Sequence, residues 1–148
     1  MAIPAQYQEI SVEGLPALSE RMQAEGHRFV QLLAVNTEAG IDVQYTFMKD
    51  GMLEVFTIKG VTPETPIPSI TDRFIAAFVF ENEIHDLFGV NVRDIAIDFG
   101  GNFYVTAQPS PMTIISPAQK AAREKAKKAA AAKAAAEAEA AKKDSAEA

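Results

Sequence analysis

The sequence predicts an α+β fold in which a small mixed or antiparallel sheet forms in the order β-α-β-β-β and is followed by helices. Three observations support this fold class. Residues 41–48 alternate apolar and polar side chains with a period of two, which is typical of a half-buried strand. Asp50-Gly51 separates this run from a second β-rich run, as in a tight hairpin. Residues 15–26 carry apolar side chains at helical spacing instead.

The first elements are a weak strand and a clear helix. Residues 8–12 alternate weakly, so we expect a short edge strand there. In the helix predicted over 15–26, Pro16 suits the first turn and Gly26 is a natural terminator.

Three strands then complete the sheet. Residues 27–36 are apolar enough for a central strand. The alternating strand at 41–48 follows, and the hairpin leads into a last strand at 52–60. We therefore expect one sheet with a helix across one face.

The next segment is predicted to be helical and then to form a second hairpin. A proline-rich connector at 61–68 cannot be an interior strand. Ser69, with Asp72 three residues later, approximates a capping box, so we expect a helix to begin there and to end at Gly89. Residues 94–106 place two β-like runs around a Gly-Gly-Asn sequence, which favours a hairpin.

The predicted domain organisation has three parts. Residues 1–99 form the α+β domain, and residues 100–117 form the hairpin end and a proline-containing extended arm. Residues 118–148 form an Ala/Lys/Glu-rich helical tail. This tail has no stripe of large apolar residues, so we expect it either to be exposed to solvent or to lie on a partner.

Composition excludes several classes of function. The chain has no cysteine, which excludes disulfides, thiolate zinc sites, iron–sulfur clusters and a cysteine nucleophile. Residues 118–148 hold eight basic and five acidic residues, which leaves six basic and fifteen acidic residues in the body of the chain. Such an acidic body should repel nucleic acid and anionic lipid. We see neither an apolar run of about 18 residues nor a signal peptide, so we expect membrane contact only through partners.

The sequence FENEIHDLFG, residues 80–89, is the strongest functional candidate. On a helix, Glu81 and Glu83 border a ridge of apolar side chains, which are Phe80, Ile84, Leu87 and Phe88. A carboxylate beside a buried ridge costs several kcal/mol unless it is paired. These acids therefore need partners.

Four explanations of the acids are open from the residues alone. A small metal-dependent hydrolase would use Glu81 and His85 as ligands. However, the zinc-protease pattern has two histidines at this spacing rather than a glutamate and a histidine, and nothing in the sequence marks a third ligand. A catalytic carboxylate–histidine pair lacks a serine elbow, phosphate loop or dinucleotide fingerprint beside it. The acids could be solvated on a structural helix. They could also be neutralised by a partner's bases, or by this chain's Arg73 and Arg93.

The stretch from 67 to 90 resembles the signature region of the C subunit of NADH-quinone oxidoreductase. It is equally similar to the corresponding small subunit of the membrane-bound, energy-converting nickel–iron hydrogenases. The weaker likeness extends back to residue 7, and the β-α-β-β-β order fits that fold. The residues that match the family pattern are Pro68, Ser69, Ala77, Glu81, Glu83, Asp86, Leu87, Phe88 and Gly89.

This resemblance implies a non-catalytic subunit of a complex I-like membrane oxidoreductase. Family members bind no cofactor and pack against a large catalytic subunit, which is nickel–iron or quinone-reducing, beside an iron–sulfur subunit. The chain would then lie at the cytoplasmic side of the membrane, reached only through other subunits. The residues expected to dock onto these partners are Ser69, Glu81, Glu83, Asp86, Phe88 and Gly89.

The chain also departs from the family pattern. Val79 stands at the family's tryptophan position and Asn82 at its arginine position, and the missing charge at Asn82 implies that at least one salt bridge of the usual network is absent. The downstream Gly-His-Pro and arginine-rich turn are absent. These departures favour the hydrogenase-type relatives over a standard quinone-module subunit. A free-standing assembly factor or adaptor with the same likeness is the alternative.

Overall fold

The computed structural model describes residues 3–113 of the chain, so the tail predicted for 118–148 lies outside the described residues. The α+β class is confirmed. In chain order the elements are β1 (Ala5–Glu9), η1 (Val12–Gly14), α1 (Leu15–Ala24), β2 (Arg28–Asn36), β3 (Ile41–Lys49), β4 (Met52–Val61), β5 (Ile67–Pro68), α2 (Ala77–Phe88), β6 (Val92–Arg93) and η2 (Pro111–Thr113).

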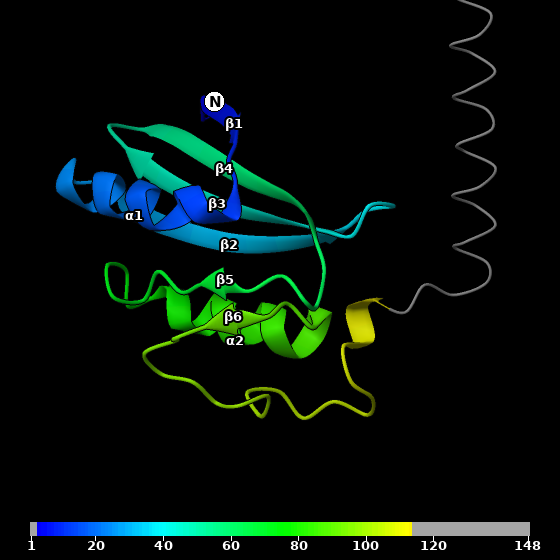
Figure 1. Cartoon of the computed structure of the whole chain (residues 1–148). Helices are drawn as coiled ribbons and strands as arrows, with labels where there is room; N and C mark the ends of the chain where they lie inside the picture. The colour runs from blue at the N-terminus through cyan, green and yellow to red at the C-terminus, as the bar shows by residue number, and fades with distance from the viewer. Residues whose placement is uncertain (1–2, 114–148) are drawn as a thin grey trace, which may run out of the picture. The chain divides into compact units, whose positions relative to one another are not determined.

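Four strands form one mixed sheet in the order β1-β4-β3-β2 (Figure 1). β2, β3 and β4 are antiparallel neighbours, whereas β1 joins the edge parallel to β4. The predicted edge strand is therefore present, but it spans Ala5–Glu9 rather than 8–12. At the turn between β3 and β4, Asp50 and Gly51 have φ angles of 50° and 78°, as the predicted tight hairpin requires.

The core lies between the sheet and the two helices. The alternation of β3 turns Val43, Tyr45 and Phe47 inward, and none of the three is exposed. Leu15 and Met22 of α1 belong to the same buried cluster, and α1 lies along one face of the sheet (Figure 1). Burying a large apolar side chain contributes about 1.5–3 kcal/mol, so Leu15 and Met22 help to hold α1 on the sheet.

Aromatic side chains connect the sheet to the segment around α2. The Phe29 ring of β2 lies 5.8 Å from that of Phe47 and 5.6 Å from that of Phe80 in α2, edge to face in both cases. The Phe74 ring, which precedes α2, lies 5.2 Å from Phe47. These ring contacts fix α2 beside β2, and the loop after β6 runs on the side of the helix away from the sheet (Figure 1).

The prediction that the second helix begins at Ser69 is wrong, because α2 spans Ala77–Phe88. Residues before it form separate turns, in one of which the Phe74 N–H donates to the Ile70 carbonyl. Ser69 does not cap a helix because its hydroxyl donates to the carboxylate of Glu81, which lies within α2.

The predicted hairpin over 94–106 is also wrong, since no strand is found among these residues. Only the short β6 pairs nearby, parallel to the equally short β5. Gly100 and Gly101 do turn the chain, with φ angles of 58° and 81°. However, side chains of α2 bind backbone groups on both sides of this turn that a hairpin ladder would need. Within residues 3–113, no helix is long and apolar enough to cross a membrane.

Candidate functional site

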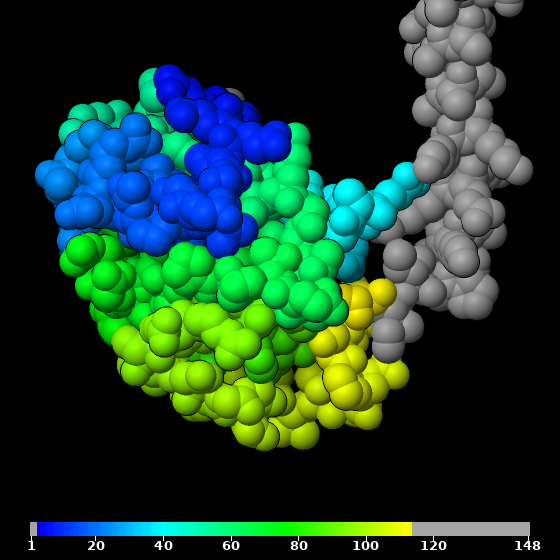
Figure 2. Space-filling view, in the orientation of Figure 1, coloured from blue at the N-terminus to red at the C-terminus, as the bar shows by residue number. Residues whose placement is uncertain are grey.

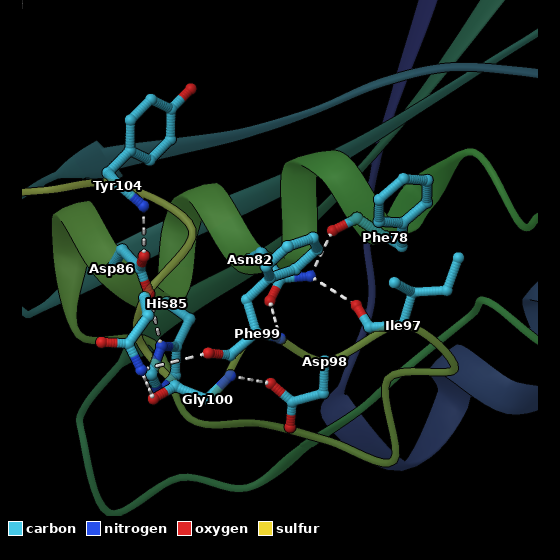
Figure 3. Close-up of polar contacts among 10 residues, drawn as sticks. Phe78, Asn82, His85, Asp86, Ile97, Asp98, Phe99, Gly100 and Tyr104 are labelled. Atoms are coloured by element: carbon cyan, nitrogen blue, oxygen red, sulfur yellow. Dashed lines mark hydrogen bonds and ion pairs between the residues drawn. The ribbon is translucent and has the colours of Figure 1, made fainter.

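Three polar side chains of α2 are buried and bind the irregular segments that precede and follow the helix. Glu81 is 0% exposed, Asn82 1% and Asp86 8%. A buried polar group is costly unless it is hydrogen-bonded, and each of these three has partners outside the helix. The predicted site is therefore a helix that organises its surroundings (Figure 3).

Glu81 is held by donors of its own chain. Its Oε2 accepts a hydrogen bond from Ser69 Oγ at 2.6 Å, and its Oε1 accepts one from the Ile70 N–H at 2.9 Å. Burial raises the pKa of Glu81, the two hydrogen bonds oppose that rise, and the nearby charge of Asp72 adds to it. The carboxylate oxygens thus bind a hydroxyl and a backbone amide, not a basic side chain.

Thr71 extends this network to the segment that follows α2. Its hydroxyl lies 2.6 Å from Ser69 Oγ, and its backbone N–H donates to the same oxygen at 3.0 Å. The Ala96 N–H donates to Thr71 Oγ1 at 2.9 Å. Ser69, a predicted docking residue, therefore lies inside a continuous set of hydrogen bonds that runs from Glu81 to Ala96.

Asn82 is the functional residue that sequence reasoning missed. Its Nδ2 donates to the Ile97 carbonyl at 2.9 Å and to the Phe78 carbonyl at 2.7 Å, while its Oδ1 accepts from the Phe99 N–H at 2.9 Å (Figure 3). All three of these partners are backbone groups. The available signal was the apolar composition of α2 around most of its circumference, because such a helix is covered on several sides and its polar residues need internal partners.

Asp86 joins the end of the helix to Tyr104. Its Oδ2 accepts a hydrogen bond from the Tyr104 N–H at 2.9 Å, and its Oδ1 lies 2.9 Å from His85 Nδ1 (Figure 3). His85 is partly exposed and borders an open hollow that Gly101 and Ser110 also line. The aspartate can orient the imidazole, but its own oxygens are both engaged within the chain.

Glu83 is the acid of α2 that is left at the surface. It is half-buried, and its Oε2 accepts a hydrogen bond from the Tyr104 hydroxyl at 2.9 Å. This hydrogen bond raises the pKa of Tyr104. Glu83 thus combines a partly exposed charge with a contact to the loop after the helix.

Phe88 and Gly89 form the end of α2, where the predicted termination is confirmed. Gly89 has a left-handed φ of 69°, and its N–H donates to the His85 carbonyl. A Cβ at this position would lie 2.7 Å from Ser110 Oγ, so a side chain is disfavoured on two grounds. Phe88 is half-buried against the core.

The metal-dependent hydrolase alternative is not assembled by this geometry. Glu81 and His85 bind different partners, so the pair required for a metal-dependent hydrolase is not formed. Among the residues that the structure describes, no group of three or more histidines, aspartates or glutamates is placed to hold a metal ion. The arrangement instead fixes segments of the chain in position.

Comparison with known proteins identifies one family and a related curated protein. The family model for the 30 kDa subunit of respiratory-chain NADH dehydrogenase matches residues 8–96. The C subunit of the NADH-quinone oxidoreductase of Chelativorans sp. (strain BNC1) is 30% identical over 112 residues, which cover 69% of this chain and 56% of the relative. The chain thus spans about half the length of this relative.

Solved structures share the fold at low sequence identity. A chain of the membrane-bound sulfane sulfur reductase, an archaeal respiratory membrane complex, superposes with a TM-score of 0.55 at 18% identity, over 61% of this chain and 57% of that one. A trypsin-resistant fragment of Nqo5 gives the same TM-score and identity, over 64% of this chain and 83% of the fragment. At this identity the likeness shows the fold.

Proposed function

The chain belongs to the family of the 30 kDa subunit of respiratory-chain NADH dehydrogenase, and from this premise we propose that it is a non-catalytic part of a complex I-like, membrane-bound oxidoreductase. It docks onto a large catalytic subunit and an iron–sulfur subunit, which carry the redox groups. It binds no cofactor itself and reaches the cytoplasmic side of the membrane only through these partners.

The observation that carries this proposal is how α2 uses its polar groups. Glu81, Asn82 and Asp86 are buried and engaged by neighbouring segments, which fits a scaffold rather than a reactive site. Glu83 alone among the acids of α2 keeps a partly exposed charge at this surface. Ser69, Glu81 and Asp86 therefore position the docking surface, while Glu83, with the neighbouring helix end at Phe88 and Gly89, belongs to it.

We assign the complex to the energy-converting hydrogenase type. The chain departs from the quinone-module pattern at Val79 and Asn82, and it lacks the Gly-His-Pro sequence. Asn82 both donates to and accepts from backbone groups of its own chain. An arginine at this buried position could not accept a hydrogen bond.

Affinity purification of the tagged full-length chain from its native membranes tests this function. The wild type should recover a large catalytic subunit and an iron–sulfur subunit in stoichiometric amounts, identified by mass spectrometry. Glu83→Lys should lower that recovery by about tenfold or more, because a like charge opposite a partner's base costs several kcal/mol. Circular dichroism of the isolated variant should be unchanged.

The matched control is Glu20→Lys, an equal charge reversal at an exposed position of α1. This variant should recover the partners as the wild type does. Full recovery with Glu83→Lys would overturn docking through α2. Transient or substoichiometric recovery by the wild type would favour an assembly factor instead.

A further inference from the structure

The loop after β6 exposes large apolar side chains on the side of α2 away from the sheet. Ile97 and Phe99 are each 43% exposed, Tyr104 is 40% exposed and Val105 is fully exposed. We call these four residues the apolar loop surface. Figure 2 shows the segment that contains them, coloured yellow-green, along one rim of the molecule. The rings of Phe99 and Tyr104 are linked through the ring of Phe103, and exposed apolar residues that lie close together typically mark an interaction site.

The apolar loop surface is fixed in position by α2. Asn82 binds the backbone on both sides of Asp98, and Asp86 binds the Tyr104 N–H (Figure 3). Within the loop, the rings of Phe99, Phe103 and Tyr104 pack edge to face in sequence, with centroids 5.0 Å apart at each step. A surface held in this way loses little conformational entropy when it binds, which favours affinity.

Acidic side chains adjoin this surface. Asp98 lies within the loop and is exposed, and Glu83 accepts a hydrogen bond from the Tyr104 hydroxyl. From residue 74 to residue 113, the only lysine or arginine in the sequence is Arg93. An apolar centre with an acidic border requires a partner with an apolar centre and a basic border.

We infer that the apolar loop surface docks onto a different protein subunit, one that presents an apolar patch bordered by lysine or arginine. This inference rests on the proposed function and names the chemistry of one partner. The surface begins after residue 96, where the match to the family model ends, so membership of the family does not assign it.

Two other occupants fit the surface less well. A second copy of this chain would bring two acidic borders together, which like-charge repulsion disfavours. The chain's own residues 118–148 are rich in lysine, but their only apolar side chain is alanine, so they offer little area to cover an aromatic surface. A different polypeptide supplies both the base and the apolar patch.

A pair of substitutions of opposite charge at Val105 tests this inference. The side chain is fully exposed, so neither Val105→Arg nor Val105→Glu should disturb the fold. In affinity purification of the full chain from native membranes, Val105→Arg should lower recovery of one partner subunit by about tenfold or more. Val105→Glu should keep recovery within about threefold of wild type, because its charge suits a basic border. Tyr7→Arg, at an exposed position of β1, is the matched control and should behave as wild type.

The outcomes separate this inference from the proposed function. Loss with Val105→Arg and retention with Val105→Glu and Tyr7→Arg supports it. Equal recovery by all variants overturns the docking surface, and greater loss with Val105→Glu overturns the basic partner. A dimer of the isolated wild-type chain that Val105→Arg dissociates, measured by light scattering, overturns the choice of a different subunit. Failure of the wild type to recover any redox subunit overturns the proposed function itself.

Discussion

The four-stranded sheet with α1 and the segments around α2 differ in what pairs their backbone groups. In the sheet, neighbouring strands bind one another over long ladders, and most of the interior side chains are apolar. Around α2, the two strands are two residues long each, and side chains of Glu81, Asn82 and Asp86 bind backbone groups instead. Replacing a polar side chain around α2 should therefore lower the free energy of unfolding, whereas replacing one in the sheet should change it little.

The largest expected effect is that of Glu81→Ala. This change leaves the Ile70 N–H and the Ser69 hydroxyl without their acceptor and opens a cavity in a fully buried site. We expect the free energy of unfolding to fall by about 3–5 kcal/mol. Urea denaturation followed by circular dichroism measures it, and a loss below about 1 kcal/mol would contradict the buried network.

Glu81→Gln is the control, because an amide keeps the shape, an acceptor for Ile70 and a donor for Ser69. It also tests the charge. Burial raises the pKa of Glu81 above the ordinary value of 4.5, so the folded state binds this proton more tightly than the unfolded state. The contribution of Glu81 to the free energy of unfolding is therefore fully present below pH 4.5, and it is lost as the pH rises through the pKa of the folded state. Urea denaturation at several pH values should show that the free energy of unfolding of Glu81→Gln does not fall over this pH range as that of the wild type does.

Asn82→Ala should have the next largest effect. It removes the amide that binds the backbone of Ile97 and Phe99, at a cost of about 1–3 kcal/mol. Hydrogen exchange should quicken at the Phe99 amide. The matched control is Gln44→Ala in β3, which removes an amide from the sheet and should change stability by at most about 0.5 kcal/mol. An equal loss in the free energy of unfolding for both variants would contradict the difference between the segments around α2 and the sheet.

Gly89→Ala compares the end of α2 with the end of α1. Gly89 and Gly26 have similar φ angles of 69° and 77°, so alanine should cost about 1 kcal/mol at either position. At Gly89 the added Cβ meets Ser110 Oγ at 2.7 Å, whereas at Gly26 it meets no described residue within 4 Å. Thermal unfolding should therefore show a larger loss for Gly89→Ala, and the double variant with Ser110→Ala, which removes only the Oγ, should recover the difference.

The smallest change, with the opposite sign, is expected for Tyr45→Phe in β3. The Tyr45 hydroxyl is buried and has no hydrogen-bond partner among the residues that the structure describes. Burial raises the pKa of Tyr45, so the hydroxyl stays neutral. Removing it should leave the free energy of unfolding unchanged or raise it by up to about 1 kcal/mol. A clear loss in urea denaturation would show that the sheet also depends on a polar core group.

The elements that sequence reasoning predicted well are those specified by neighbouring residues. Alternation predicted β3, Asp50-Gly51 predicted the hairpin and Gly89 predicted the end of α2. Two of the wrong predictions, a helix start at Ser69 and a hairpin over 94–106, share a cause. The Ser69 hydroxyl, which would cap a helix, binds Glu81 instead, and the Phe99 N–H, which a hairpin would use, binds Asn82. Both partners belong to α2 and are distant in sequence.

The sequence by itself determined the α+β order, the family and the need of buried acids for partners. Only the tertiary structure decided which partners these are. Alternation and turn residues act over a few positions, because they depend on local backbone geometry. The contacts of Glu81 with Ser69, Asn82 with Phe99 and Asp86 with Tyr104 join residues 12, 17 and 18 positions apart. Such contacts form only once the fold has brought the segments together, because no local rule places a side chain against a distant backbone amide.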